Sequence, residues 1–397
     1  MANILFYDKQ IYWNCPDYAV DFLKKLREKN HKIFVIYGNW NDKEDMKAFE
    51  KSTGFKFKQI YQGFDSKAIH SLRDLKIVVS YFQPDIYISN FSIRGFERDI
   101  LRFIKKNGKI KIIELDNVAS EIMLYNKLHF LYLFRILPNS LISYLKKFFR
   151  KYFYYLIIGD KSILNSESLK LHADFLCLKG QFFKDYLLKF QDMQIHSHKI
   201  LVTGSLQLEY IRNSKAVQKS FFDKYGLDIN KPLIIVMPNP IKTYLKNVSF
   251  NFIDCCLEQI TNSGKYNILL NLHPSDRFRG INQYSHHDVK IIQNGDLYPL
   301  LKFSLAAISS RSTIGLETSY AEVPILIDEN DAGILDFPYL EKGNRVGLAV
   351  NSNNISETLC KVENGYYSFD FTNFNRYYSI GKNQNSVDEI IRIVDSV

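Results

Sequence analysis

Residues 305–317 read Leu-Ala-Ala-Ile-Ser-Ser-Arg-Ser-Thr-Ile-Gly-Leu-Glu, an apolar run that ends in a hydroxyl-rich turn and continues with a helical pattern. A short apolar run of this kind is typical of a strand buried on both faces of a parallel sheet. The backbone N–H groups at the start of the following helix favour an anion such as a phosphate. The hydroxyls could equally serve as an ordinary helix N-cap. The stretch therefore predicts a strand–turn–helix unit with a candidate phosphate site.

Short apolar runs alternate with longer amphipathic stretches along the whole chain. This pattern predicts an α/β fold with two Rossmann-like domains that face each other across a cleft. We expect an N-terminal acceptor-side domain over 1–210, a C-terminal nucleotide-sugar-binding domain over 211–385, and a helix over 386–397. One arrangement open to that helix is to pack back on the N-terminal domain. The expected strands cover residues 3–7, 32–37, 85–89, 110–115, 175–178, 200–203, 233–237, 268–272, 289–292, 305–308 and 324–327.

Composition limits the classes of function. The 397 residues are 46% hydrophobic and 24% charged, as in globular proteins, and the formal net charge of +10 favours anionic partners. No zinc finger, RNP-type motif or basic arm is present, so nucleic acid is not an expected partner. The five cysteines form no CxxC pair, and we expect no disulfide framework, no zinc site and no cofactor.

Two further patterns concern localisation. Near the N-terminus, Ile4, Leu5 and Phe6 form a short apolar step that ends at Asp8, which is unlike a secretory leader. No window reaches the roughly 18 apolar residues that a spanning helix needs. We expect a cytoplasmic protein. Its aromatic and basic stretch over 127–155 could dock on the inner face of the membrane, or could be ordinary helices that cover the first domain.

His273 and Pro274 belong to the stretch 271–276, which directly follows the apolar run over 266–270. Proline cannot donate to a strand ladder, so the chain must turn out of the sheet there. His273 then lies at the carboxyl end of a parallel strand, where open α/β sheets bind ligands. An imidazole in that place can contact a phosphate or transfer a proton, although it could also bond a loop carbonyl.

The spacing of these motifs resembles the nucleotide-binding half of bacterial capsule polysaccharide transferases of the GT-B class, in particular polysialyltransferases and Kdo transferases. His273 and Pro274, the serine-rich turn about forty residues later, and the Val323-Pro324-Ile325 step carry the resemblance. It implies a metal-independent glycosyltransferase whose donor is a CMP-activated acid sugar. The expected donor-binding residues are His273, Pro274, Ser309, Ser310, Ser312, Thr313 and Glu317, and we add Gly204 and Asn239, which follow other predicted strands.

The first domain is expected to supply the acceptor site and a general base. Glu114 and Asp116 lie at the end of the predicted strand over 110–115. In polysialyltransferases an acidic-acidic-glycine element has this role, whereas here Leu115 separates the two acids and Asn117 replaces the glycine. A carboxylate at a strand end could also be a turn residue. Asp8, after the first strand, is the reserve candidate.

The function expected from the sequence is transfer of a sugar from a nucleotide donor to a cell-surface glycan, or to a lipid-linked precursor of one. Three alternatives remain open at this point. One is glycerol phosphate transfer from CDP-glycerol, the second is a UDP-sugar transferase or epimerase, and the third is a non-enzymatic role as a glycan-assembly scaffold. No phosphate loop of the GxxxxGK[ST] type and no GxGxxG turn is present, which disfavours an ATPase or a dehydrogenase.

Overall fold

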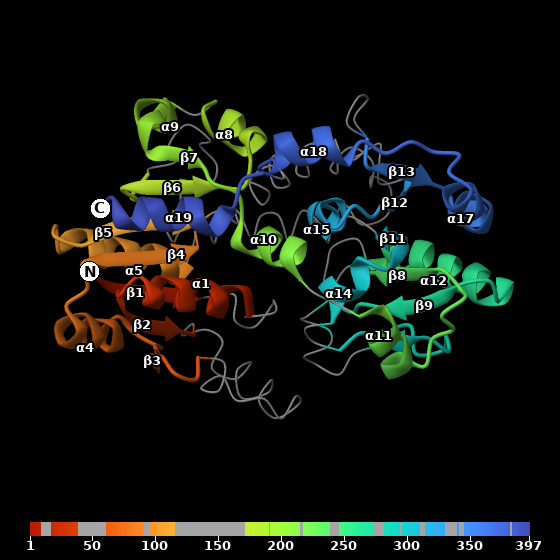
Figure 1. The fold of residues 1–397 in the computed structure, drawn as a ribbon, viewed down its shortest axis with the longest axis horizontal. Helices are drawn as coiled ribbons and strands as arrows, with labels where there is room; N and C mark the ends of the chain where they lie inside the picture. The colour runs from red at the N-terminus through yellow and green to blue at the C-terminus, as the bar shows by residue number, and fades with distance from the viewer. Residues whose placement is uncertain are drawn as a thin grey trace, which may run out of the picture.

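Two parallel β-sheets, each covered by helices, form the body of the computed structural model (Figure 1). The structure describes residues 1–8, 17–38, 61–90, 95–115, 171–189, 191–214, 217–238, 246–273, 276, 282–293, 296–309, 314–329, 340, 345–381 and 383–397.

The N-terminal sheet has seven strands in the order β3-β2-β1-β4-β5-β6-β7, and every neighbouring pair is parallel. Its central strands are almost continuous runs of apolar residues, as expected for strands covered on both faces. The order reverses beside β1, the arrangement of a Rossmann sheet. The strands are β1 (Asn3–Asp8), β2 (Lys32–Tyr37), β3 (Asp65–Ala68), β4 (Ile86–Asn90), β5 (Lys111–Leu115), β6 (Phe175–Leu178) and β7 (Ile200–Val202).

Alternating side chains of this sheet enter two separate apolar clusters. Ile4 and Phe6 of β1 belong to the cluster that contains α1 and the C-terminal helix α19 (Ser386–Asp395), whereas Leu5 and Tyr7 belong to the cluster that contains α4, α5 and α8. This is the period of two that a strand imposes on its side chains. The helices are α1 (Asp17–Glu28), α4 (Leu72–Phe82), α5 (Gly95–Lys106), α8 (Gln181–Leu187), α9 (Gln191–Ile195) and the 3₁₀ turn η3 (Ser197–Lys199).

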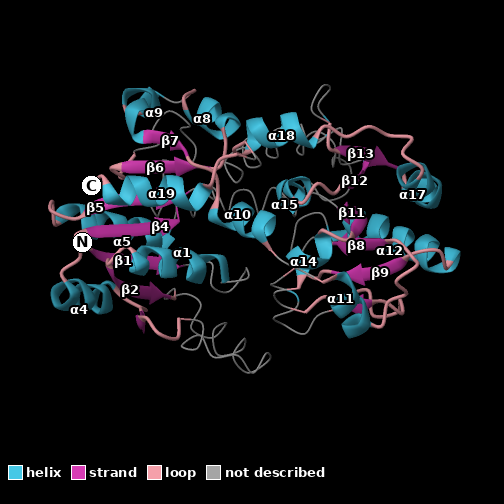
Figure 2. Ribbon diagram, viewed as in Figure 1, coloured by secondary structure: helices cyan, strands magenta, loops and turns pink. Residues whose placement is uncertain are grey.

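The C-terminal sheet has six parallel strands in the order β10-β9-β8-β11-β12-β13, so its order reverses beside β8. The strands of both sheets point toward the middle of the molecule, so that their carboxyl ends face each other (Figure 2). The strands are β8 (Leu233–Met237), β9 (Asn267–Leu270), β10 (Lys290–Ile291), β11 (Ser304–Ser309), β12 (Ile325–Asp328) and β13 (Gly347–Val350).

Helices also cover both faces of the second sheet. Ile234 and Val236 of β8 pack with α12 and α17, while Leu233 and Ile235 pack with α11 and α14. The helices of this half are α11 (Gln218–Tyr225), α12 (Lys246–Ser263), α14 (Leu297–Leu301), α15 (Ile314–Tyr320), α17 (Ile355–Glu363) and α18 (Phe371–Tyr378), with the 3₁₀ turn η5 (Ser352–Asn354).

In the residues that the structure describes, the chain passes between the two halves twice. The first passage is α10 (Leu206–Asn213), whose Leu206 packs in the first domain while Leu208 and Ile211 pack in the second. The second is the C-terminal return through α18 to α19 (Ser386–Asp395) (Figure 1). Val387, Ile390, Ile391 and Val394 of α19 are buried with β1 and α1, so this helix lies on the N-terminal domain.

The observed sheets confirm the predicted α/β class, and each predicted strand lies within a residue or two of an observed one. The edge strands β3 and β13 were not predicted. The proposed boundary between residues 210 and 211 falls inside α10, and the position of the boundary stays a prediction. Among the described residues, no helix combines the length and apolar character needed to cross a bilayer.

Gly204 lies where the two passages meet and has a φ of +79°. A Cβ atom there would be 2.2 Å from Ser386 Oγ and 2.7 Å from Ile380 Cδ1, too close for either to stay in place. We therefore expect Gly204→Ala to reduce the free energy of unfolding by roughly 2–4 kcal/mol, since backbone strain and overpacking add. Urea denaturation measures this change.

Gly108→Ala is the matched control for that experiment. Gly108 also has a positive φ, +62°, but a Cβ there would meet no atom within 4 Å. In this variant the free energy of unfolding should fall by only about 1 kcal/mol, which is the cost of placing alanine at a positive φ. An equal decrease in the free energy of unfolding of the two variants would contradict the close approach of the C-terminal return to Gly204.

Candidate active site

Ser309, one of the candidate donor residues, lies at the point where the strand order of the second sheet reverses. Ser309 ends β11 and Met237 ends β8, and the Ser309 hydroxyl donates a hydrogen bond of 2.9 Å to the Met237 carbonyl. The bond ties together the ends of the two strands that flank the reversal. In open α/β sheets this place is the usual ligand crevice.

His273 follows the neighbouring strand β9 and is partly exposed. Its carbonyl accepts a bond of 2.9 Å from the backbone N–H of Asp276, so the chain turns sharply here as the proline predicts. His273 therefore lies at the same carboxyl edge as Ser309. Pro274, Asn239, Ser310, Ser312 and Thr313 lie outside the described residues, and their roles stay predictions.

Ser309 and Gly204 have structural roles that sequence reasoning did not anticipate. The Ser309 side chain is fully buried and bonded to Met237, which explains the residue without a ligand. Gly204 lies in the N-terminal half, packed against the C-terminal return. The structure thus gives each residue a packing reason, and any contact with a donor stays a prediction.

Glu317 occupies the first turn of α15, facing groups from both halves of the chain. The Gln207 amide in α10 donates to a Glu317 carboxylate oxygen at 3.0 Å and to the Tyr298 hydroxyl at 2.5 Å. Tyr298 is itself hydrogen-bonded to Glu317. Lys179, directly after β6 of the N-terminal sheet, contributes a positive charge. Glu317 is therefore a meeting point of the two domains.

Burial raises the pKa of Glu317 from its ordinary 4.5 to about 7, although the Lys179 charge and the bonds from Tyr298 and Gln207 oppose the shift. A carboxyl group with this pKa exchanges its proton near neutral pH. It can accept hydrogen bonds from sugar hydroxyls when ionised and can donate one when protonated. Lys179, Gln207 and Tyr298 were missed from the sequence, and only Lys179 follows a predicted strand.

Two of the three candidate acids of the first domain, Asp8 and Glu114, leave the sheet on opposite faces. Asp8 alternates with Phe6, on the side of α1 and α19, and Glu114 alternates with Ile112, on the side of α4, α5 and α8. Both are buried, at 2% and 1% exposure. Asp116 lies outside the described residues.

Asp8 has a defined partner in Tyr61, whose hydroxyl donates to its carboxylate. Burial, followed by the Asp8 charge and this bond, raises the pKa of Tyr61 well above its ordinary value, so the phenol keeps its proton at neutral pH. Tyr61 thus remains a fixed donor to the end of β1.

No protein-family model and no curated protein matches the chain. The wall teichoic acid polymerase TagF matches over 99% of this chain and 89% of its own, at 14% identity and a TM-score of 0.59. UDP-GlcNAc 2-epimerase from Methanocaldococcus jannaschii matches over 100% and 99%, at 15% identity and a TM-score of 0.55. S. aureus MnaA, solved with UDP, matches over 100% and 96%, at 13% identity and a TM-score of 0.54.

The fold is of the GT-B type. These matches extend over both Rossmann-like domains, so they confirm the two-domain architecture that the sequence predicts. At 13–15% identity they establish the fold alone. The narrower resemblance to capsule polysialyltransferases and Kdo transferases stays a prediction.

The raised pKa of Glu317 predicts a specific pH dependence of stability. Between pH 4.5 and about 7 the folded state keeps the Glu317 proton while the unfolded chain releases it. Stability from this group is therefore greatest in acid, falls as the pH rises toward 7, and changes no further above it. Glu317→Gln, which cannot titrate, should lack this component.

Urea denaturation of wild type and Glu317→Gln from about pH 5 to pH 8 measures the difference. We expect the wild-type free energy of unfolding to decline relative to that of the variant as pH rises, and the difference to become constant above neutral pH. If the free energies of unfolding of the two proteins change in parallel across this pH range, the pKa of Glu317 is not shifted.

Proposed function

We propose that this chain is a transferase that moves a nucleotide-activated sugar or glycerol phosphate onto a cell-surface glycan acceptor. The proposal rests on the arrangement of the two β-sheets, whose carboxyl edges face each other. His273, Ser309 and Glu317 lie at the edge of the second sheet, and the buried acids Asp8 and Glu114 lie at the edge of the first. A nucleotide on one edge and an acceptor on the other would meet between the domains.

The donor we propose is linked to a nucleoside diphosphate, as in CDP-glycerol or a UDP-sugar. The family resemblance of the sequence implied a CMP-activated acid sugar instead. The similar structures include a polymerase of wall teichoic acid solved with CDPG and S. aureus MnaA solved with UDP, which favours a diphosphate donor. The formal charge of +10 suits a phosphate-rich donor or acceptor.

An epimerase is the second candidate, since two of the similar structures are UDP-GlcNAc 2-epimerases. The two functions differ in whether an acceptor is consumed. Incubation with UDP-GlcNAc alone distinguishes them, because an epimerase converts the sugar without any acceptor and a transferase does not.

A nucleotide panel tests the proposed donor. A ligand that binds only the folded state raises its apparent stability, by about 2.7 kcal/mol at a concentration one hundred times the dissociation constant. We expect CDP or UDP to raise the melting temperature more than GDP. CMP does not separate the two cytidine donors, because glycerol phosphate transfer from CDP-glycerol releases CMP just as sugar transfer from a CMP-sugar does, so the panel also includes CDP-glycerol. Stabilisation by CMP without stabilisation by CDP-glycerol or UDP would return the donor to the CMP-sugar class, and no response to any of them would contradict nucleotide binding.

His273→Ala should lower turnover by about 10²-fold, the usual scale for loss of a proton-transfer or electrostatic group. Steady-state kinetics with the donor that the panel identifies measure this loss. His198→Ala is the matched control because His198 is exposed in η3, outside the carboxyl edge of the second sheet. Near-normal turnover in a folded His273→Ala protein would make His273 a turn residue only.

The general base is assigned by three parallel variants, Asp116→Asn, Glu114→Gln and Asp8→Asn. Loss of the base should abolish transfer while nucleotide affinity stays unchanged, because the donor binds the other domain. We keep Asp116 as the first candidate and Glu114 as the second. Activity in all three variants would remove the acid–base role from this edge of the sheet.

Membrane docking through residues 127–155 belongs to the same proposal, since a glycan acceptor can be lipid-linked. The segment lies outside the described residues. Its sequence carries Lys146, Lys147, Arg150 and Lys151 among aromatic and aliphatic residues. Sedimentation with anionic and neutral liposomes, for wild type and for the variant with these four residues changed to Gln, tests the idea. Equal binding by both proteins would end it.

A further inference from the structure

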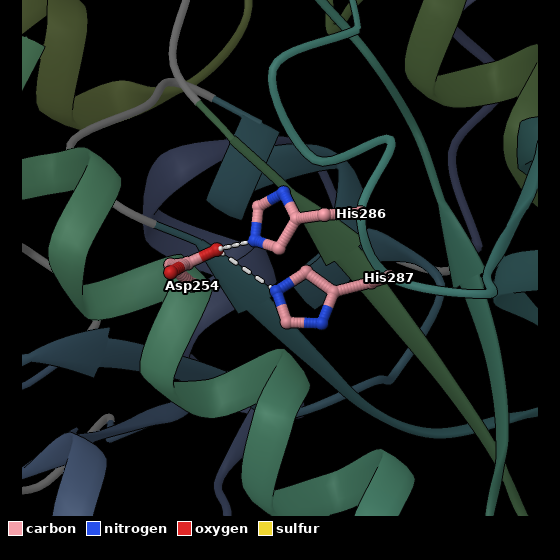
Figure 3. A group of neighbouring side chains, drawn as sticks. All are labelled: Asp254, His286 and His287. Atoms are coloured by element: carbon pink, nitrogen blue, oxygen red, sulfur yellow. Dashed lines mark hydrogen bonds and ion pairs between the residues drawn. The ribbon is translucent and has the colours of Figure 1, made fainter.

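Two histidines and one carboxylate converge on the outer side of the second domain. His286 Nε2 lies 2.7 Å and His287 Nε2 lies 2.8 Å from the same oxygen, Oδ1 of Asp254 (Figure 3). The two imidazole rings lie beside each other, with centroids 4.2 Å apart. All three potential ligand atoms fall within 4.8 Å of one another. We propose that Asp254, His286 and His287 form a binding site for a divalent transition-metal ion.

The chemistry of the ligand atoms selects the class of ion. Imidazole nitrogen together with one carboxylate oxygen suits Zn²⁺, Co²⁺, Ni²⁺ or Cu²⁺, whereas Mg²⁺ and Ca²⁺ prefer all-oxygen ligands. Three protein ligands leave a fourth tetrahedral position for water. The half-exposed His286 side chain, at 54%, gives water and the ion a route to the group.

The geometry needs only a small adjustment. An ion bonded at about 2.0–2.2 Å holds tetrahedral ligands about 3.3 Å apart. The present N–O separations of 2.7 and 2.8 Å are those of hydrogen bonds donated by the two imidazoles. The ion fits once the Asp254 oxygen and each histidine Nε2 atom move apart by about 0.5 Å. Each neutral imidazole then moves its proton from Nε2 to Nδ1, and Nε2 becomes the ligand atom.

Both ligand-bearing elements are anchored before any ion binds. Asp254 lies on α12, whose Ile253 and Leu257 are fully buried in the core of the second domain. Tyr284 enters the same core two residues before His286. A bond from the Tyr284 backbone N–H to the Asn282 side chain, and bonds within 284–289, shape the turn. A preformed site costs little ordering on binding.

The position indicates a structural role for the ion. The turn with His286 and His287 leads into the amino end of β10, the edge opposite the carboxyl ends that carry His273 and Ser309. An ion there would link α12 to the turn that enters the edge strand β10. It would stabilise the second domain and would take no part in transfer.

The test uses tag-free full-length protein that has been dialysed against a chelator. Calorimetric titration with Zn²⁺ should give one ion per chain, and Co²⁺ should give the visible absorption of a bound ion. Zn²⁺ should also raise the melting temperature. His286→Gln and Asp254→Asn should each weaken Zn²⁺ binding by at least about tenfold, since even indirect partners of a metal site are worth that much.

His198→Gln is the matched control, because it removes an exposed histidine remote in sequence from the group and should leave Zn²⁺ affinity unchanged. Circular dichroism checks that each variant folds. If Asp254→Asn fails to fold, His286→Gln decides the matter, since its side chain is largely exposed. Absence of Zn²⁺ binding below about a millimolar, or binding that is equal in wild type and His286→Gln, would overturn the proposal.

Discussion

The buried carboxylate of Glu209 holds together the two passages of the chain between the domains. It accepts hydrogen bonds from Arg212 at 2.5 Å and Asn213 at 2.7 Å, both in α10, and from the backbone N–H of Ser386 at 3.1 Å, at the start of α19. Arg212 also donates to the Gln384 carbonyl at 2.6 Å. A buried charge is tolerated only when it is paired and hydrogen-bonded, so these partners are fixed with respect to one another. The C-terminal return is thereby locked against α10.

This contact between α10 and the C-terminal return helps to determine where the carboxyl edges of the two sheets lie. Phe182 of α8 packs on Tyr378 of α18 with ring centroids 4.5 Å apart, and the Asn375 amide of α18 donates to the Ser319 carbonyl of α15 at 3.1 Å. The N-terminal sheet, the return segment and the helix that carries Glu317 are therefore in continuous contact. Burial at this junction raises the pKa of Glu317 because it disfavours the charged form of the carboxyl group. A site at such a junction can respond to how the domains close.

The sequence was informative wherever one element carries its own pattern. Apolar runs located the central strands, and the proline after His273 located a turn at a strand end. The edge strand β3, with the sequence Asp-Ser-Lys-Ala, escaped prediction because an edge strand needs no long apolar run. The edge strand β13, with Gly-Leu-Ala-Val, was also missed, although its sequence is apolar. The sequence also did not predict the side-chain groups that assemble from distant parts of the chain. Gln207 and Glu317 are 110 residues apart, and Asp254 and His286 are 32 apart, so no local pattern records either contact.

We propose that the donor nucleotide binds at the carboxyl edge of the second sheet, where its strand order reverses. Hydrogen–deuterium exchange with and without saturating CDP or UDP can locate the bound nucleotide, because ligand contact slows the opening of backbone amides. We expect slower exchange in peptides that cover 268–276 and 304–320, with little change in the strands of the first sheet. Protection confined to the N-terminal domain, or absent from both peptides while the nucleotide is bound, would contradict it.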